Sequence, residues 1–180
     1  MKKEGKSYAA MKTPNKYRKY IPWILAALVV LLSFLMSGMS SADSHSVSGT
    51  LTQRVIRFLR PLIDFFRESP DWQIYNETNF ILRKAVHVIT YFLLTLFISL
   101  GIRGITDNKV KVYVGACIAV LVIAAVDEFH QSFVAGRGAS AFDVFIDMMG
   151  AASAFALVAV WRLTNIVLAW LRRGWPRKDI

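Results

Sequence analysis

The chain has 180 residues, of which 55% are hydrophobic and 19% are charged, and its formal net charge is +10. A soluble domain averages about 45–50% apolar and roughly 25% charged residues, so the composition argues against a soluble globular domain. The basic residues collect beside the apolar segments, where they indicate membrane topology. We therefore expect no nucleic-acid partner.

Four apolar segments are long enough to cross a bilayer as helices, which takes about 20 residues with a range of roughly 17–25. They cover residues 21–38, 85–102, 110–126 and about 144–163. The small residues at 40–42 make the first segment resemble a signal peptide. We favour a retained helix, because a long basic arm precedes it and its apolar run exceeds the usual length of about 7–15 residues.

The distribution of Lys and Arg predicts the orientation. Fifteen basic and three acidic residues lie in the N-terminal arm, in the connection around residues 103–111 and at the C-terminal end, against seven basic and nine acidic residues elsewhere. Because basic residues collect on the cytoplasmic side, we expect both termini in the cytoplasm. The protein is then expected to be a multi-pass membrane protein.

We divide the chain into three parts: a basic cytoplasmic arm at residues 1–20, a membrane domain at 21–168 and a basic cytoplasmic tail at 169–180. The fold class that follows is an all-α membrane protein with four transmembrane helices, and with an amphipathic outer-surface helix between the first two.

That amphipathic helix is predicted at residues 47–66, within an outer loop at 39–84. Apolar residues recur there at helical spacing, with arginines on the other face, which is typical of a helix lying in the membrane interface. A helix that caps the bundle fits the pattern equally well. Pro61 should end or kink it, and the second transmembrane helix is expected to begin near Ile81.

Three of the predicted helices carry polar side chains near their outer ends, at spacings that place those of one helix on one face. They are Lys84, His87 and Tyr91 on the second helix, Asp127, His130 and Gln131 on the third, and Asp143 and Asp147 on the fourth. Glu128 points about 100° away from Asp127, so we expect it to face a different neighbour. Ionisable groups inside a membrane are functional-site candidates by default. We therefore predict one polar cluster at the depth of the outer leaflet.

Two stretches of the chain, RKAVHVITYFLL and DEFHQSFVAGRGASAFDVFIDMMGA, resemble the signature regions of the VanZ-like family of bacterial membrane proteins. The matching positions are Lys84, His87 and Tyr91, then Asp127, Glu128 and Gln131, then Gly136 and Arg137, and finally Ser140 and Asp143. The family often has Asn four residues beyond the last Asp, where this chain has Asp147. The resemblance covers nearly all of residues 20–165.

The resemblance implies the fold more strongly than the function. The namesake of the family is associated with low-level resistance to the glycopeptide teicoplanin, without a settled biochemical activity. The resemblance therefore implies a cell-envelope membrane protein with a link to teicoplanin-type resistance.

Three interpretations of the cluster follow from its residues. Its groups can pair with one another and only fix the helix packing, with Lys84 and Arg137 neutralising two of the four carboxylates.

The cluster can instead bind a ligand, and Arg137 then recognises an anionic group. The ligand is expected to be a membrane lipid, a lipid-linked cell-wall precursor or an amphiphilic drug. The candidate binding residues are Lys84, His87, Tyr91, Glu128, Gln131, Arg137 and Asp143.

The third interpretation is a membrane enzyme that acts on a lipid-linked substrate. Asp127 or Glu128 beside His87 would supply acid–base catalysis, and Arg137 would stabilise developing charge. A metal site is a weaker variant, because Asp127-x-x-His130 is a single pair of ligands on one face. We expect neither a metal nor a cofactor.

Overall fold

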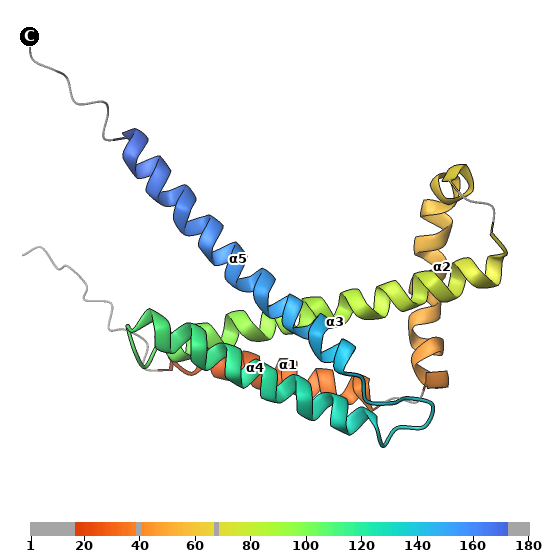
Figure 1. Cartoon of the computed structure of the whole chain (residues 1–180), viewed down its shortest axis with the longest axis horizontal. Coiled ribbons are helices and arrows are strands. Elements are labelled where there is room, and N and C mark those ends of the chain that lie inside the picture. Colours follow the sequence, from red (N-terminus) through yellow and green to blue (C-terminus); the bar gives the residue numbers. More distant parts are fainter. Residues whose placement is uncertain (1–16, 39–40, 67–68, 173–180) are drawn as a thin grey trace, which may run out of the picture.

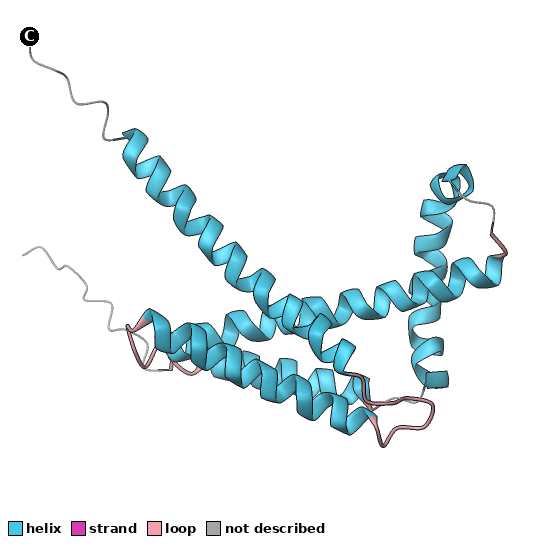
Figure 2. Cartoon of the chain, viewed as in Figure 1, coloured by secondary structure: helices cyan, strands magenta, loops and turns pink. Residues whose placement is uncertain are grey.

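The computed structural model describes residues 17–38, 41–66 and 69–172, without the side chains of residues 41–48 and 66. This part consists of five α-helices joined by short loops (Figure 2). They are α1 (Ile21–Ser37), α2 (Ser41–Phe66), α3 (Asp71–Arg103), α4 (Lys109–Gln131) and α5 (Ala141–Arg172). The predicted all-α class is confirmed for these residues. Most of the predicted basic arm, residue 40 of the small-residue stretch and most of the basic tail lie outside them.

Three helices, α3, α4 and α5, are long and apolar enough to cross a membrane. The apolar helix α1 has only 17 residues, which is the lower end of the range of roughly 17–25 for a span. The structure thus bears out the membrane character of three of the four predicted segments. The fourth span and the orientation of the termini stay predictions.

The second predicted transmembrane helix is longer than expected. α3 begins at Asp71, after Pro70, and not near Ile81. Packing against α2 stabilises this polar first part, because the buried Thr52 donates a hydrogen bond of 3.2 Å to the buried Asn79. At about 1.5 Å per residue, the 33 residues of α3 exceed the hydrocarbon core of about 30 Å. α3 is therefore longer than a perpendicular span requires.

The amphipathic segment is helical and runs across the first part of α3 (Figure 1). Pro61 lies inside α2 and does not end it, but the last turns run in a different direction from the rest of the helix (Figure 1). Phe58 of α2 is 84% exposed, so it does not pack on the bundle. This exposure favours a helix whose apolar side faces lipid over one that caps the bundle.

Small residues allow the helices to cross closely. Gly150 of α5 lies so near α3 that an added Cβ atom would collide with the carbonyl oxygen of Val88. Gly101 of α3 lies against the ring of Trp23 from α1 in the same way. The buried core is correspondingly small and apolar. It contains Ala26 of α1, Tyr91, Leu94 and Ile98 of α3, Ala116, Val120 and Ala124 of α4, and Ala151 of α5. The last turns of α5, after Arg162, lie apart from the other helices (Figure 1).

Candidate functional site

The predicted polar residues meet at one end of the bundle. α1 and α4 end there, α5 begins there, and α3 passes through (Figure 1). The cluster, defined as Ser37, Lys84, His87, Tyr91, Asp127, Glu128, Gln131, Arg137, Asp143 and Asp147, therefore combines residues from four helices and one loop.

Two polar pairs join α3 to α5. The Lys84 ammonium forms an ion pair with Asp143, and each side chain is about a quarter exposed. One turn further along both helices, His87 Nδ1 lies 3.2 Å from Asp147 Oδ1. The Asp147 side chain is fully buried, so His87 holds its carboxylate in place at the helix crossing.

A second group of contacts joins α4 to α1. The Ser37 hydroxyl donates a hydrogen bond of 2.9 Å to Asp127 Oδ2. Gln131 Nε2 donates to the same carboxylate oxygen at 3.2 Å and to Ser37 Oγ at 3.3 Å. All three side chains are buried. Sequence reasoning missed Ser37, although Ser33 and Ser37 stand one helical turn apart in an otherwise apolar helix, a spacing that predicts a shared polar face.

The loop between α4 and α5 closes over the cluster. Gly136 has a φ of 76°, a left-handed conformation that glycine adopts without a steric penalty, and the chain turns there. Glu128 Oε2 accepts a hydrogen bond of 2.8 Å from the backbone N–H of Ser140, just before α5 begins. A helix N-terminus favours a nearby negative charge. Glu128 thus faces a different neighbour from Asp127, as its position predicted.

Arg137 is held by the same loop and reaches α1. Its guanidinium donates a hydrogen bond of 3.3 Å to the carbonyl oxygen of Ser37. Burial lowers the pKa of Arg137, and the charge of Arg83 adds to this effect, while Asp127 and Glu128 oppose it. The neutralisation of a carboxylate by Arg137 stays a prediction: its hydrogen bond goes to a backbone oxygen, while the charges of Asp127 and Glu128 act on it. Lys84 does pair with a carboxylate, that of Asp143.

Several buried polar atoms of the cluster have no hydrogen-bond partner among the described residues. They are the Tyr91 hydroxyl, Asp127 Oδ1, Glu128 Oε1, Arg137 Nε and Asp147 Oδ2. Tyr91 lies beside Ser33 and within range of the charges of Asp127, Glu128 and Asp147. The large majority of buried polar side-chain atoms in proteins are paired. Five unpaired atoms within one cluster therefore mark a place where protons, water or a ligand would complete the bonding.

The cluster contains more carboxyl groups than basic side chains. Four carboxylates face two permanent cations, Lys84 and Arg137, together with His87. The His130 ring stacks on Phe34 of α1 at 5.6 Å between centroids, and its buried Nδ1 has no hydrogen-bond partner among the described residues. No group of three or more metal-ligating side chains occurs within the described ranges.

The comparisons with known proteins agree with the motifs. The model of the family described as VanZ/LLP1 matches residues 22–162. A search of curated proteins gave no significant match, and neither did a search of solved structures. The matched range contains all five helices except the first residue of α1 and the last ten residues of α5.

Proposed function

The chain belongs to the VanZ/LLP1 family, and on that premise we propose that it is a cell-envelope membrane protein whose polar cluster binds the headgroup of a lipid-linked molecule. The cluster faces the outer leaflet of a bacterial cytoplasmic membrane, and both termini are cytoplasmic. A contribution to teicoplanin-type glycopeptide resistance belongs to this proposal, because resistance of that kind depends on lipid-linked cell-wall material.

One observation carries the proposal, namely the set of unpaired buried polar atoms at the cluster. Each unpaired buried polar group costs about 1–3 kcal/mol, so a bound headgroup that pairs with these atoms gains affinity at the cluster. Among the described residues, the unpaired atoms include hydrogen-bond acceptors, such as Asp147 Oδ2, and hydrogen-bond donors, such as Arg137 Nε. A ligand that matches them must offer hydroxyl or amide donors together with an anionic group.

The position of the cluster along the helices fits a headgroup site. Lys84 and Arg103 are nineteen residues apart on α3, or about 28 Å at the rise of an α-helix. This separation matches a hydrocarbon core of about 30 Å. Lys84 and the cluster then lie at one membrane boundary, where a headgroup reaches them while its lipid chain stays among the helices and the bilayer.

The chemistry of the cluster favours a headgroup of mixed character. Lys84 and Arg137 attract phosphate or carboxylate oxygens. The carboxylates of Asp127, Glu128 and Asp147 accept hydrogen bonds from sugar hydroxyls or peptide amides. A polyprenyl-linked cell-wall precursor carries all of these groups, and an amphiphilic glycopeptide drug carries the sugars and amides as well.

The binding test is the recovery of lipid with the purified protein. We expect wild-type protein, extracted in mild detergent from bacterial membranes, to retain a lipid-linked headgroup that mass spectrometry identifies. His87→Ala, Glu128→Ala and Arg137→Ala should each lower retention about tenfold at normal membrane levels. Ser132→Ala is the matched control, because its exposed hydroxyl bonds to the Phe129 carbonyl oxygen and lies outside the cluster. Parallel loss of folded protein in the three cluster variants would instead support a structural network.

A second candidate function is catalysis, and the pair of His87 and Asp147 favours it. A carboxylate that binds Nδ1 orients the imidazole and leaves Nε2 to exchange a proton with a substrate. Incubation of the protein with bacterial lipid extract tests this candidate. A product of changed mass that disappears with Glu128→Gln and His87→Gln would establish catalysis, whereas retention of an unmodified lipid by wild type would establish binding alone.

A further inference from the structure

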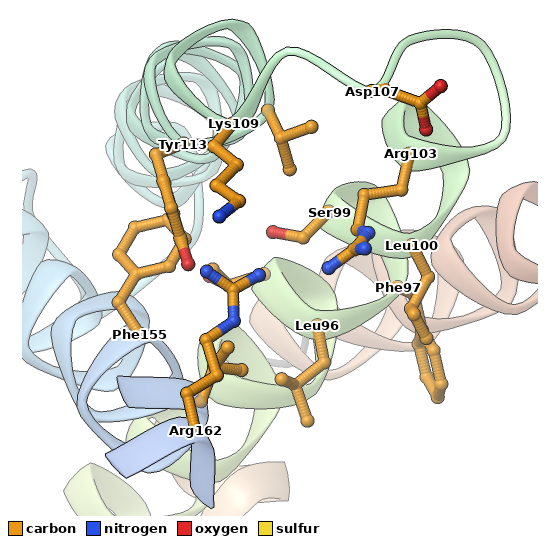
Figure 3. Close-up of a pocket in the computed structure, with 13 residues that line it drawn as sticks. Leu96, Phe97, Ser99, Leu100, Arg103, Asp107, Lys109, Tyr113, Phe155 and Arg162 are labelled. Carbon is orange, nitrogen blue, oxygen red and sulfur yellow. The ribbon is translucent and has the colours of Figure 1, made fainter. Parts of the chain in front are cut away.

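A cavity of about 190 Å³ lies at the opposite end of the bundle from the polar cluster. The last turns of α3, the first turns of α4 and the middle of α5 line it (Figure 3). It shares no residue with the cluster, so an inference about this cavity does not depend on the proposed function.

Three basic side chains converge on this cavity. The charged ends of Arg103, Lys109 and Arg162 come from three different helices and point toward the same space around Ser99 (Figure 3). The Ser99 hydroxyl is buried and has no hydrogen-bond partner in the described part of the chain. Asp107 is the one acidic residue of the lining, and its carboxylate points away from the cations (Figure 3).

These cations have no partner of opposite charge among residues 17–38, 41–66 and 69–172. No ion pair joins Arg103, Lys109 or Arg162 to a carboxylate within the part of the chain that the structure describes. Arg162 lies instead over the ring of Tyr113, at 5.8 Å from its centroid. Three like charges brought together repel one another, so an anion between them would relieve this repulsion.

The first turn of α4 does not supply the anion site. The side chain of Asn108 already accepts hydrogen bonds from the N–H groups of Val110 and Lys111, at 3.0 and 3.2 Å. The basic side chains and the free Ser99 hydroxyl are therefore the groups that remain for an anion.

The rest of the cavity is apolar. Leu96, Leu100, Phe155 and Val158 form its walls between α3 and α5. A free phosphate ion would gain nothing from such walls, whereas a lipid acyl chain would bury apolar surface against them. The cations lie about one bilayer thickness from Lys84 along α3, which is the depth of the headgroups in the opposite leaflet.

We propose that this cavity binds an anionic phospholipid, with its phosphate among Arg103, Lys109 and Arg162 and one acyl chain along Leu96 and Val158. On the predicted orientation this is a lipid of the cytoplasmic leaflet. Each basic residue near a membrane surface contributes about 1 kcal/mol to the attraction of anionic lipid, which corresponds to roughly fivefold in affinity.

Native mass spectrometry of the full chain in detergent, with phosphatidylglycerol or phosphatidylcholine added, tests the proposal. We expect phosphatidylglycerol to be retained over phosphatidylcholine. Arg103→Gln and Arg162→Gln should each weaken retention roughly fivefold, and the double variant roughly 25-fold. Val158→Phe, which keeps every charge but fills the apolar part, should weaken it as well. Lys111→Gln is the matched control, since it removes the same charge two residues from Lys109 but does not line the cavity.

The proposal is overturned if phosphatidylglycerol and phosphatidylcholine are retained equally, or if Lys111→Gln weakens retention as much as Arg162→Gln. Adding inorganic phosphate distinguishes a site for a lipid phosphate from a site for a free phosphate ion. If millimolar phosphate displaces the lipid and Val158→Phe has no effect on retention, the cavity is a site for free phosphate. That result would also overturn the proposal. Thermal unfolding of each variant identifies any that is misfolded. Leu96→Trp then provides a second way to fill the apolar part.

Discussion

The close crossing of α3 and α5 at Gly150 gives the sharpest prediction about stability. An added Cβ atom at this position would collide with the backbone carbonyl oxygen of Val88 and would lie 3.2 Å from both the backbone nitrogen of Phe92 and the Cβ of Tyr91. Backbone atoms of a packed helix cannot rotate away as a flexible side chain does. Gly150→Ala must therefore push α5 away from α3.

Two opposing effects set the magnitude for Gly150→Ala. Alanine is favoured over glycine inside a helix by about 1 kcal/mol, whereas overpacking of a well-packed core costs typically about 1–3 kcal/mol. The clash here involves rigid backbone and separates the buried Ala151 and Ala154 from α3, so the upper part of that range applies. We expect a net destabilisation of about 1–2 kcal/mol, and a larger one for Gly150→Leu.

Thermal unfolding of purified protein in detergent measures this effect. At about 2–4 °C per kcal/mol for a chain of this size, Gly150→Ala should lower Tm by several degrees. Gly138→Ala is the control, because no heavy atom lies within 4 Å of its added Cβ, and it should leave Tm near that of wild type. A Tm for Gly150→Ala equal to or above that of wild type would show that helix propensity dominates, and would refute the steric reasoning.

Three further predictions concern the cluster and its loop. Lys84→Met and Asp143→Asn should each destabilise the protein. The double variant should lose less stability than the sum of the two single losses, with a coupling energy of about 0.5–3 kcal/mol in a double-mutant cycle measured by thermal unfolding. Additive losses of stability would contradict the ion pair. Gly136→Ala should cost about 1–2 kcal/mol, because φ is 76° there and alanine is strained in that conformation; unfolding at the wild-type temperature would rule this out. Ser37→Ala leaves Asp127 Oδ2 with one donor fewer, so we expect a loss of about 1–3 kcal/mol and reduced lipid retention, while Ser37→Thr, which keeps the hydroxyl, should restore both.

Helical spacing and charge patterning predicted much of the candidate site. The residues Lys84, His87 and Tyr91 share one face of a helix whatever packs against it, and Asp143 and Asp147 do the same. An apolar environment gives such groups few other partners, so the faces of the helices that carry them turn toward one another. The meeting of α3 with α5, and of Asp127 with Gln131, follows from this alone.

The remaining features depend on tertiary contacts that periodicity does not encode. The polar sequence at the start of α3 has no strong helical pattern, and packing of Asn79 against Thr52 of α2 stabilises it. Ser37 belongs to the cluster only because α1 ends beside α4. The atom that the Arg137 guanidinium contacts depends on the direction of the chain after the Gly136 turn. The spacing of residues in the sequence does not predict this direction.

α3 is a single unbroken helix of 33 residues, and both candidate ligands would contact it. Lys84 and His87 belong to the polar cluster, whereas Ser99 and Arg103 belong to the basic cavity. A rigid helix transmits a rotation or an axial shift over its whole length, so a headgroup that displaces α3 at one membrane surface also moves the cations at the other. Any such coupling is reciprocal: the factor by which the phospholipid changes affinity for the headgroup equals the factor by which the headgroup changes affinity for the phospholipid. The lipid composition of one leaflet would thereby set the occupancy of a site in the other.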